Sequence, residues 1–443
     1  MTSLFASDVL LPEGWAKNVR MEVDPAGSFS SVKEKSDPHD AEKLAGPVLP
    51  GVANLHSHAF QRAMAGLTEV RGAPEDDFWS WRELMYKFLA RLTPERAQAV
   101  ARQLYIEMLK HGYTAVGEFH YVHDRSAELL MGHLAAAQES GIAITLLPSL
   151  YRWSNFGSKP LQPRQQRFDS DAAFVLRLFG QLQTHAGLDI RIGVSPHSLR
   201  AVDPDSLKEL VHGLPAGTPI HIHAAEQTKE VDECVAALGR RPVEWLLENF
   251  KVDARWCLVH ATHMTPGETA ALAKSGATTG LCPTTEANLG DGIFPLPAYR
   301  AAGGRYGIGG DSHVSRDPAE ELRLLEYAQR LVARRRNLVV GERSPAVGTT
   351  LWLEAAAGGR ALGRAMGAIA PGQRADLVVL DADHPDLAGR SGDTIANALI
   401  FSGTTGLVRD VMVGGTWTVR AGHHPREEQA ANAYKHALAE LLT

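Results

Sequence analysis

The stretch Leu49-Pro-Gly-Val-Ala-Asn-Leu-His-Ser-His58 decides the fold and much of the chemistry predicted for this chain of 443 residues. It is typical of a short buried β-strand that ends in two histidines one residue apart. Side chains at positions i and i+2 of a strand point to the same side, so His56 and His58 can converge on one ion. Two neutral imidazoles supply half of a four-ligand site for zinc or iron. A His-x-His pair alone is equally compatible with two polar residues at a strand end.

Three later segments supply the missing ligand types, and each follows an apolar, strand-like run. They are Pro219-Ile-His-Ile-His-Ala-Ala-Glu226 with His223 and Glu226, Cys257-Leu-Val-His-Ala-Thr262 with His260, and Tyr306-Gly-Ile-Gly-Gly-Asp-Ser-His313 with Asp311. A (β/α)₈ barrel builds its site from the C-terminal ends of several strands. The sequence therefore predicts an α/β fold with a TIM-like (β/α)₈ barrel.

Apolar β-runs alternate with helical stretches over residues 49–365, which we predict to be the barrel. The β-runs after the first are Tyr113–His120, Ile142–Leu147, Asp189–Ser195, Pro219–His223, Trp256–His260, Thr278–Leu281 and Arg305–Gly309. Segments between them, such as Pro94–His111 and Pro318–Arg336, have apolar residues at helical spacing. This alternation favours parallel strands joined by right-handed crossovers.

The two ends of the chain, residues 1–48 and 366–443, have a different texture. Asp24-Pro-Ala-Gly27 is a turn signal among short strand-like runs, and Ala370–Asp381 is a turn followed by a strand. Asp410–Val419 indicates a hairpin around Gly414-Gly415. We predict that the two ends pair in a small split β-sandwich domain, which finishes with an amphipathic helix over Pro425–Leu442.

The ordered set of His56-x-His58, His223, Glu226, His260 and Asp311 resembles the amidohydrolase superfamily. Five motifs make the chain similar to one family within it, the formimidoylglutamate deiminases (N-formimino-L-glutamate iminohydrolases). They are His56-Ser-His-Ala-Phe-Gln-Arg62, Trp79-Ser-Trp-Arg-Glu83, Glu118-Phe-His-Tyr121, Ser195-Pro-His-Ser-Leu-Arg200 and Cys282-Pro-Thr-Thr-Glu-Ala-Asn-Leu289. The resemblance implies the same barrel with a split small domain and a homodimer. It also implies hydrolysis of N-formimino-L-glutamate to N-formyl-L-glutamate and ammonia in histidine degradation.

Composition agrees with a soluble metabolic enzyme. Hydrophobic residues make up 44% and charged residues 22%, and the net charge of −6 argues against a nucleic-acid partner. The odd number of cysteines, three without a Cys-x-x-Cys pair, favours a reducing compartment. The N-terminus does not resemble a signal peptide, and we find no apolar run of membrane-spanning length. We expect a cytoplasmic protein with no membrane partner.

The predicted metal ligands are three nitrogens and one oxygen, a set suited to zinc with iron as the competitor: His56, His58, His223 and Asp311. His221 faces the same way as His223, but His223 lies nearer the strand end and its spacing from Glu226 matches the family pattern. Binuclear members of the superfamily carry a bridging carboxylated lysine at the end of the fourth strand. Here Gly193-Val-Ser-Pro-His197 has no lysine, so we predict one divalent ion per chain, Zn²⁺ or Fe²⁺.

Three residues are predicted to carry the reaction. Asp311 would accept the proton of the attacking water with the oxygen that does not ligate. His260 would orient or polarise that water, or else only support Asp311. Glu226 would protonate the formimino nitrogen and the leaving ammonia, for which it needs a raised pKa. Without His223 three residues earlier, Glu226 would be an ordinary glutamate at a helix start.

The family resemblance also implies the residues that bind a substrate with two carboxylates: Gln61, Arg82, Tyr121, His197 and Arg200. Gln61 would contact the formimino group, and the other four would hold the carboxylates, because guanidinium groups bind carboxylates through paired hydrogen bonds. Taken singly, any one of them would normally be interpreted as a surface charge or a helix-facing aromatic residue. Two alternatives stay open: a deaminase of a cyclic amidine (guanine, cytosine or an adenosine derivative), and a catalytically inactive barrel used for binding.

Overall fold

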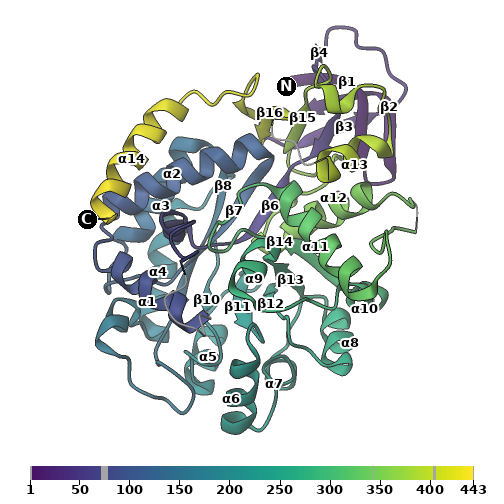
Figure 1. The fold of residues 1–443 in the computed structure, drawn as a ribbon. Helices are drawn as coiled ribbons and strands as arrows, with labels where there is room; N and C mark the ends of the chain where they lie inside the picture. The colour runs from purple at the N-terminus through teal and green to yellow at the C-terminus, as the bar shows by residue number, and fades with distance from the viewer. Residues whose placement is uncertain (1, 71–77, 343, 403–405, 443) are drawn as a thin grey trace.

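Two β-sheets organise the computed structural model, which describes residues 2–70, 78–342, 344–402 and 406–442 (Figure 1). The larger sheet has the order β10-β8-β7-β6-β14-β13-β12-β11, with β9 also paired to β8, and all of its pairings are parallel. Its strands are β6 (Val52–Ser57), β7 (Tyr113–His120), β8 (Ala143–Leu150), β9 (Ile190–Ile192), β10 (Ser195–Pro196), β11 (Ile220–Ala224), β12 (Trp256–His260), β13 (Thr278–Leu281) and β14 (Arg305–Ile308).

Two isolated parallel bridges close this sheet into a ring. Val194 pairs with Ile220 and Ser198 pairs with His223, which joins the segment around β9 and β10 to β11. On the other side, β14 pairs directly with β6. Strands β9 and β10 therefore share the fourth position, and the predicted (β/α)₈ barrel is confirmed.

Helices connect the barrel strands and cover the outside of the ring (Figure 1). The α-helices are α1 (Phe78–Leu89), α2 (Pro94–His111), α3 (Glu128–Ser140), α4 (Ala172–Leu182), α5 (Pro204–His212), α6 (Thr228–Leu238), α7 (Pro242–Asn249), α8 (Pro266–Ser275), α9 (Pro283–Leu289), α10 (Leu296–Ala301), α11 (Pro318–Ala333), α12 (Val347–Gly358), α13 (Asp393–Phe401) and α14 (Glu427–Leu442). Short 3₁₀ helices are η1 (Ala59–Met64), η2 (Pro163–Phe168), η3 (Gln183–His185), η4 (Gly359–Leu362) and η5 (Pro385–Leu387).

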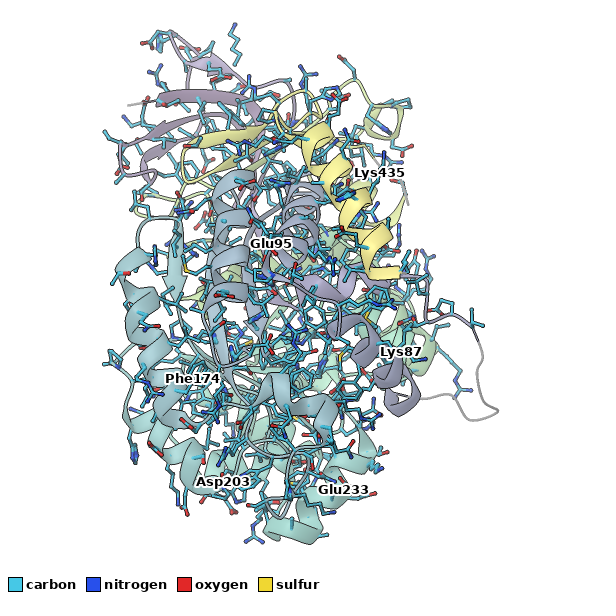
Figure 2. All side chains as sticks on the ribbon, turned by 90° about the vertical axis from the view of Figure 1, so that its left-hand side faces the viewer. Lys87, Glu95, Phe174, Asp203, Glu233 and Lys435 are labelled. Carbon is cyan, nitrogen blue, oxygen red and sulfur yellow. The ribbon has the colours of Figure 1, made fainter. Side chains whose placement is uncertain are left out.

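Helix α2 has the bounds predicted from the sequence, because its ends carry strong local signals. The Thr93 side chain accepts a hydrogen bond from the Arg96 N–H at 3.3 Å, and Pro94 occupies the first turn. Gly112 ends the helix with φ 103°. Helix α14 lies along α2 (Figure 2), and Lys110 of α2 pairs with Glu427 of α14 at 2.6 Å.

The smaller sheet joins strands from both ends of the chain in the order β17-β16-β15-β5-β1-β2-β3, with β4 paired to β1. These strands are β1 (Thr2–Leu11), β2 (Gly14–Val23), β3 (Phe29–Lys33), β4 (Glu42–Lys43), β5 (Val48–Pro50), β15 (Leu377–Leu380), β16 (Val408–Val413) and β17 (Thr416–Val419). A separate apolar core includes Leu4, Val19, Leu377 and Met412. The small β domain predicted from the two ends of the chain is confirmed, including the hairpin at Gly414-Gly415.

The stretch 49–58 differs from the single strand that we predicted. Residues Val48–Pro50 form β5 in the smaller sheet, and β6 begins at Val52 in the barrel. Gly51 lies between them, where a Cβ atom would collide with the Thr114 side chain. The chain thus passes from one sheet to the other at a residue where only glycine fits.

Several predicted segments differ from the observed bounds, and none of these differences moves a predicted site residue. The run Asp189–Ser195 is divided between β9 and β10, β14 ends at Ile308 rather than Gly309, and α14 begins at Glu427 rather than Pro425. The helix predicted over Pro318–Arg336 ends at Ala333 because Arg334 is left-handed. Over the described ranges, none of the helices combines the length and apolar character needed to cross a membrane.

Candidate active site

The residues predicted to bind metal and to carry the reaction lie close together at the C-terminal ends of the barrel strands. His56 lies near the end of β6 and His58 directly follows it, His223 lies on β11, and His260 is the last residue of β12. Asp311 follows β14 and is held beside β6 by a parallel bridge to Ser57. Because parallel strands all end at one mouth of the ring, residues far apart in the sequence share one site.

Three imidazoles and one carboxylate converge at this mouth. The Nε2 atoms of His56 and His223 are 3.0 Å apart. Asp311 Oδ1 lies 3.3 Å from His56 Nε2 and 3.4 Å from His58 Nε2. The structure therefore brings together the four residues predicted to bind the metal.

The protonation states of the three histidines and of Asp311 suit the binding of a cation. The Nδ1 atoms of His58 and His223 donate to the carbonyl oxygens of Phe119 and His197, at 2.7 and 2.9 Å, which leaves each Nε2 for a ligand. Burial lowers the pKa of His56 to about 3, and it also lowers the pKa of His58 and His223. Although burial opposes its charge, the histidines lower the pKa of Asp311. Neutral imidazoles around an ionised carboxylate fit a divalent metal such as zinc.

His221, the other histidine of β11, has a different environment. Its Nε2 atom bonds to the carbonyl oxygen of Ala361 at 3.1 Å. Ala361 belongs to η4. The histidines near the mouth whose nitrogen atoms lie close enough together to share an ion are His56, His58 and His223, and His221 is not in that group.

Glu226, His260 and Asp311 surround one side of the site. His260 Nε2 lies 3.8 Å from Glu226 Oε1 and 4.0 Å from Asp311 Oδ2. Burial raises the pKa of Glu226 to about 7, against the opposing charge of His260. Burial lowers the pKa of His260, but the carboxylates of Glu226 and Glu286 outweigh it and raise the value to about 10. A charged Glu226 thus favours a protonated His260, and a proton on Glu226 removes that effect.

Backbone strain accompanies this arrangement. His260, Asp311 and Ala225, which precedes Glu226, have φ values of 67°, 48° and 52°, in the left-handed region that non-glycine residues rarely adopt. Such residues are found at functional sites when the surrounding structure holds them in place.

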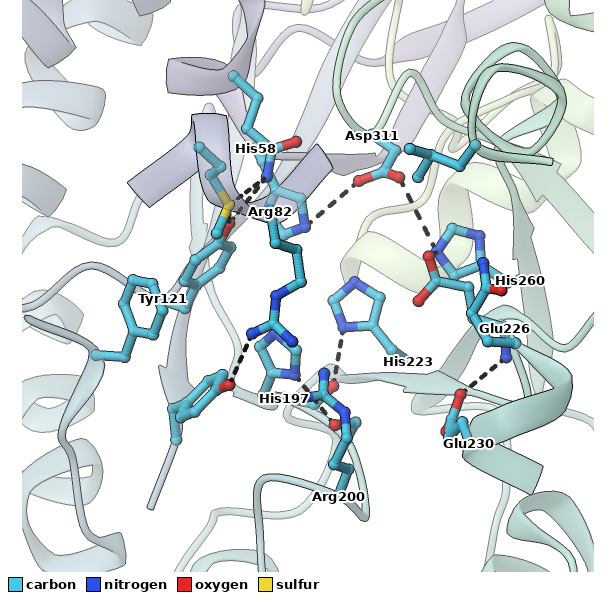
Figure 3. Close-up of a pocket in the computed structure, with 17 residues that line it drawn as sticks. His58, Arg82, Tyr121, His197, Arg200, His223, Glu226, Glu230, His260 and Asp311 are labelled. Carbon is cyan, nitrogen blue, oxygen red and sulfur yellow. Dashed lines mark hydrogen bonds and ion pairs between the residues drawn. The ribbon is translucent and has the colours of Figure 1, made fainter. Parts of the chain in front are cut away.

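A pocket opens beside these groups, and ten of the eleven predicted site residues line it (Figure 3). They are His58, Gln61, Arg82, Tyr121, His197, Arg200, His223, Glu226, His260 and Asp311. The eleventh, His56, is fully buried and contacts His223, which lines the pocket. Arg82 extends from α1, and Arg200 comes from the segment after β10.

The two arginines are nearly buried, with 9% of Arg82 and 7% of Arg200 exposed. Arg82 Nη2 donates to the hydroxyl groups of Tyr86 at 2.9 Å and Tyr151 at 3.3 Å. Gln61 Nε2 donates to the Tyr121 hydroxyl at 2.8 Å, and the centroid of the Tyr121 ring lies 4.9 Å from that of the His58 ring. The predicted aromatic neighbours Phe78, Trp79 and Trp81 have side chains outside what the structure describes.

The sequence reasoning missed three buried residues that support the site. Tyr151 follows β8 and bonds to both arginines, which lower its pKa although burial opposes this. Glu230 accepts the backbone N–H groups of Ala225 and Glu226 at 3.3 and 3.0 Å. Glu286 lies 3.2 Å from His260 Nδ1. The strand-end rule could have found Tyr151, whereas Glu286 lies inside a motif used only for the resemblance.

Comparison with known families matches nearly the whole chain. The Amidohydrolase family matches residues 48–418, and the family described as "Formimidoylglutamate deiminase HutF, N-terminal domain" matches residues 1–45. The formimidoylglutamate deiminase of Pseudomonas aeruginosa is 52% identical over 100% of both chains. A 5-methylthioadenosine/S-adenosylhomocysteine deaminase of Natronomonas pharaonis is 32% identical, over 83% of this chain and 80% of the relative.

Solved structures agree with the fold. The crystal structure of an amidohydrolase from Brucella melitensis has a TM-score of 0.93 and 45% identity, with 100% of both chains covered. An adenosine deaminase from Xanthomonas campestris with bound zinc has a TM-score of 0.82, covering 100% of this chain and 98% of the other. At 20% identity, the second similarity is one of fold alone.

Proposed function

The chain belongs to the amidohydrolase family, and within it to the formimidoylglutamate deiminases, and from this we infer that it hydrolyses N-formimino-L-glutamate. The products are N-formyl-L-glutamate and ammonia, in histidine degradation. One observation supports this choice of substrate: Arg82 and Arg200, both nearly buried, line the same pocket as Glu226 and the histidines His58, His223 and His260. A substrate with one carboxylate for each guanidinium group and a formimino carbon beside the imidazoles fits this pocket.

We propose that His56, His58, His223 and Asp311 hold one divalent ion, with zinc favoured over iron. The support is the three-nitrogen, one-oxygen donor set and the anchored Nδ1 atoms of His58 and His223. When bound, such an ion lowers the pKa of a coordinated water from 15.7 to about 7. No lysine lines the described part of the pocket, which agrees with a single ion rather than a bridged pair.

Asp311 would act as the base. Its Oδ1 faces His56 and His58, and its Oδ2 faces His260 at 4.0 Å. Oδ2 is therefore placed to accept a proton from the water that attacks the formimino carbon. His260, held between Asp311 and Glu226, would orient that water and stabilise the negative charge that develops during attack.

Glu226 would act as the acid. With a pKa of about 7, a substantial fraction of Glu226 carries a proton at neutral pH. It can give this proton to the terminal formimino nitrogen as the water oxygen bonds to carbon. The nitrogen takes up a second proton and leaves as ammonia when the C–N bond breaks. The two protons of the attacking water balance the step: one, accepted by Asp311, supplies the leaving nitrogen, and the other, released as the hydroxyl becomes the carbonyl, restores the proton of Glu226.

The remaining pocket residues would fix the substrate. Arg82 and Arg200 would each take a carboxylate, with Tyr121 and His197 as further donors, and Gln61 would contact the formimino group beside the imidazoles. Burial lowers the pKa of His197 well below its ordinary value, so it would act as a neutral donor.

An ammonia-release assay tests this function. Purified protein with its metal should release ammonia from N-formimino-L-glutamate and form N-formyl-L-glutamate in equal amounts. Guanine, cytosine and adenosine derivatives are the comparison substrates. Faster release from one of these would replace our inference with the cyclic-amidine alternative. Metal binding without release from any of them would favour an inactive binding barrel.

Two further features stay predictions. We expect a homodimer, which light scattering after size-exclusion chromatography would measure, and a cytoplasmic location, which cell fractionation would test.

A further inference from the structure

We propose that Glu286 is a positioning residue for the reaction: its carboxylate fixes the His260 ring so that Nε2 faces the space between Glu226 and Asp311. The inference rests on the proposed function, because it assumes that His260 acts on the reacting water. Glu286 lies in α9, after β13, and reaches the neighbouring strand end from outside the pocket.

One carboxylate oxygen joins two parts of the structure. Glu286 Oε1 lies 3.2 Å from His260 Nδ1 and also accepts the Cys282 N–H at 2.9 Å. Glu286 is 4% exposed and His260 is 1% exposed, so water does not compete freely for this contact. Because the Cys282 N–H holds the same oxygen, the acceptor for the His260 ring has a fixed position.

The other ring nitrogen faces the reaction space. His260 Nε2 lies near one oxygen each of Glu226 and Asp311, and within the described residues this buried atom has no hydrogen-bond partner. Turning the ring by 180° about the Cβ–Cγ bond would exchange Nδ1 with Cδ2 and Nε2 with Cε1, so carbon atoms would face Glu286 and the reaction space. The Nδ1–H bond to Glu286 favours the observed orientation, as an orienting carboxylate does for a catalytic histidine in hydrolases.

A purely structural role is the competing explanation, because Glu286 also binds the N–H that precedes α9. Glu321 of α11 provides a matched control for that role. Its Oε2 accepts the Thr284 N–H at 2.9 Å and its Oε1 accepts the Thr284 hydroxyl at 2.6 Å. It is a second buried glutamate that holds the start of α9, but both of these contacts go to Thr284 rather than to His260.

Two substitutions separate the effect of the hydrogen-bond acceptor of Glu286 from the effect of its negative charge. Glu286→Gln keeps an oxygen that can accept from both donors, whereas Glu286→Met removes the acceptor. With metal-loaded enzyme and formiminoglutamate, we expect kcat to fall by about 100-fold in Glu286→Met and less in Glu286→Gln, with KM and metal content little changed. Glu321→Met should lower the thermal midpoint but keep kcat within about 2-fold.

A double-substitution cycle tests whether Glu286 acts through His260. In a His260→Asn background, Glu286→Met should cost no further activity, because the ring that it positions is gone. An equal loss in both backgrounds, or an unchanged kcat in Glu286→Met, would overturn the proposal.

An NMR measurement gives a readout independent of turnover. In protein labelled with ¹⁵N-histidine, the His260 Nδ1 signal, assigned by its loss in His260→Asn, should shift in Glu286→Gln and stay in place in Glu321→Gln. A signal unmoved by Glu286→Gln would refute the contact. If unaltered protein releases no ammonia from formiminoglutamate, the proposed function fails, while this measurement still tests the contact itself.

Discussion

Replacing Arg200 with methionine should greatly weaken the use of formiminoglutamate without releasing the metal. Arg200 is 7% exposed, and its side chain lines the pocket from the segment after β10. It is not one of the four proposed metal ligands. Methionine keeps much of the length and the apolar stem but removes the guanidinium group. A substrate carboxylate would then enter a buried space without its ionic partner.

The size of the loss follows from this burial. Truncating one partner of a buried, hydrogen-bonded charge pair costs about 2–5 kcal/mol. Since about 1.4 kcal/mol corresponds to a tenfold change in rate, kcat/KM should fall by about 30- to 5000-fold. A value near the lower limit would mean that water reaches the carboxylate when the substrate is bound.

The assay compares formiminoglutamate with its two monoamides, each of which lacks one carboxylate charge. For unaltered protein, both amides should be poor substrates. Arg200→Met should narrow the gap for one amide, and the matched variant Arg82→Met should narrow it for the other. Metal content, measured by elemental analysis, should stay at one equivalent. If both variants keep nearly normal kcat/KM on formiminoglutamate, the two-carboxylate reasoning is wrong.

Three other residues give separate tests of the proposed site. Glu226→Gln should retain the metal while kcat falls by about 10²–10⁴-fold, and loss of the metal would instead identify Glu226 as a ligand. Because Glu226 would act in its protonated form and its pKa is about 7, kcat of the unaltered protein should fall as pH rises above about 7. If Glu226→Gln has measurable turnover and shows the same fall in kcat, Glu226 is not the acid. His56→Ala should lose the ion and most activity, and two metal equivalents in unaltered protein, both required, would contradict a single-ion site. Tyr151→Phe removes the hydroxyl bonded to both arginines, so KM should rise by about 2- to 10-fold with the metal retained; an unchanged KM would show that this hydroxyl does not affect substrate binding.

Much of the barrel could be predicted because its strands are buried on both faces. Such strands are continuous apolar runs, and Tyr113–His120, Trp256–His260 and Thr278–Leu281 have the predicted bounds. The passage from β5 to β6 could not be predicted in the same way. Residues Val48–Pro50 are as apolar as a barrel strand, and their place in the smaller sheet depends on pairing with Leu377–Val379, far along the chain.

Several of the predicted site residues could be found because they lie at the ends of barrel strands. The glutamates that were missed lie on helices and support the site through contacts with other residues. His56, His223 and Asp311 follow from polar groups at the ends of three barrel strands, β6, β11 and β14. Glu230 and Glu286, by contrast, contact backbone N–H groups and a histidine ring. Helical spacing gives these glutamates no feature that separates them from solvent-facing ones, so only the packed structure identifies their partners.

The positions of the arginines separate substrate choice from the reaction. The proposed metal ligands and Glu226 lie at or just after the ends of barrel strands, where pairing between neighbours fixes their spacing. Arg82 instead comes from α1, and Arg200 from the connection that follows β10. Connections can change without disturbing the ring of strands. A different substrate could therefore be accommodated by altering these two segments while the metal ligands stay in place, which is why the arginine variants should lose formiminoglutamate and keep their metal.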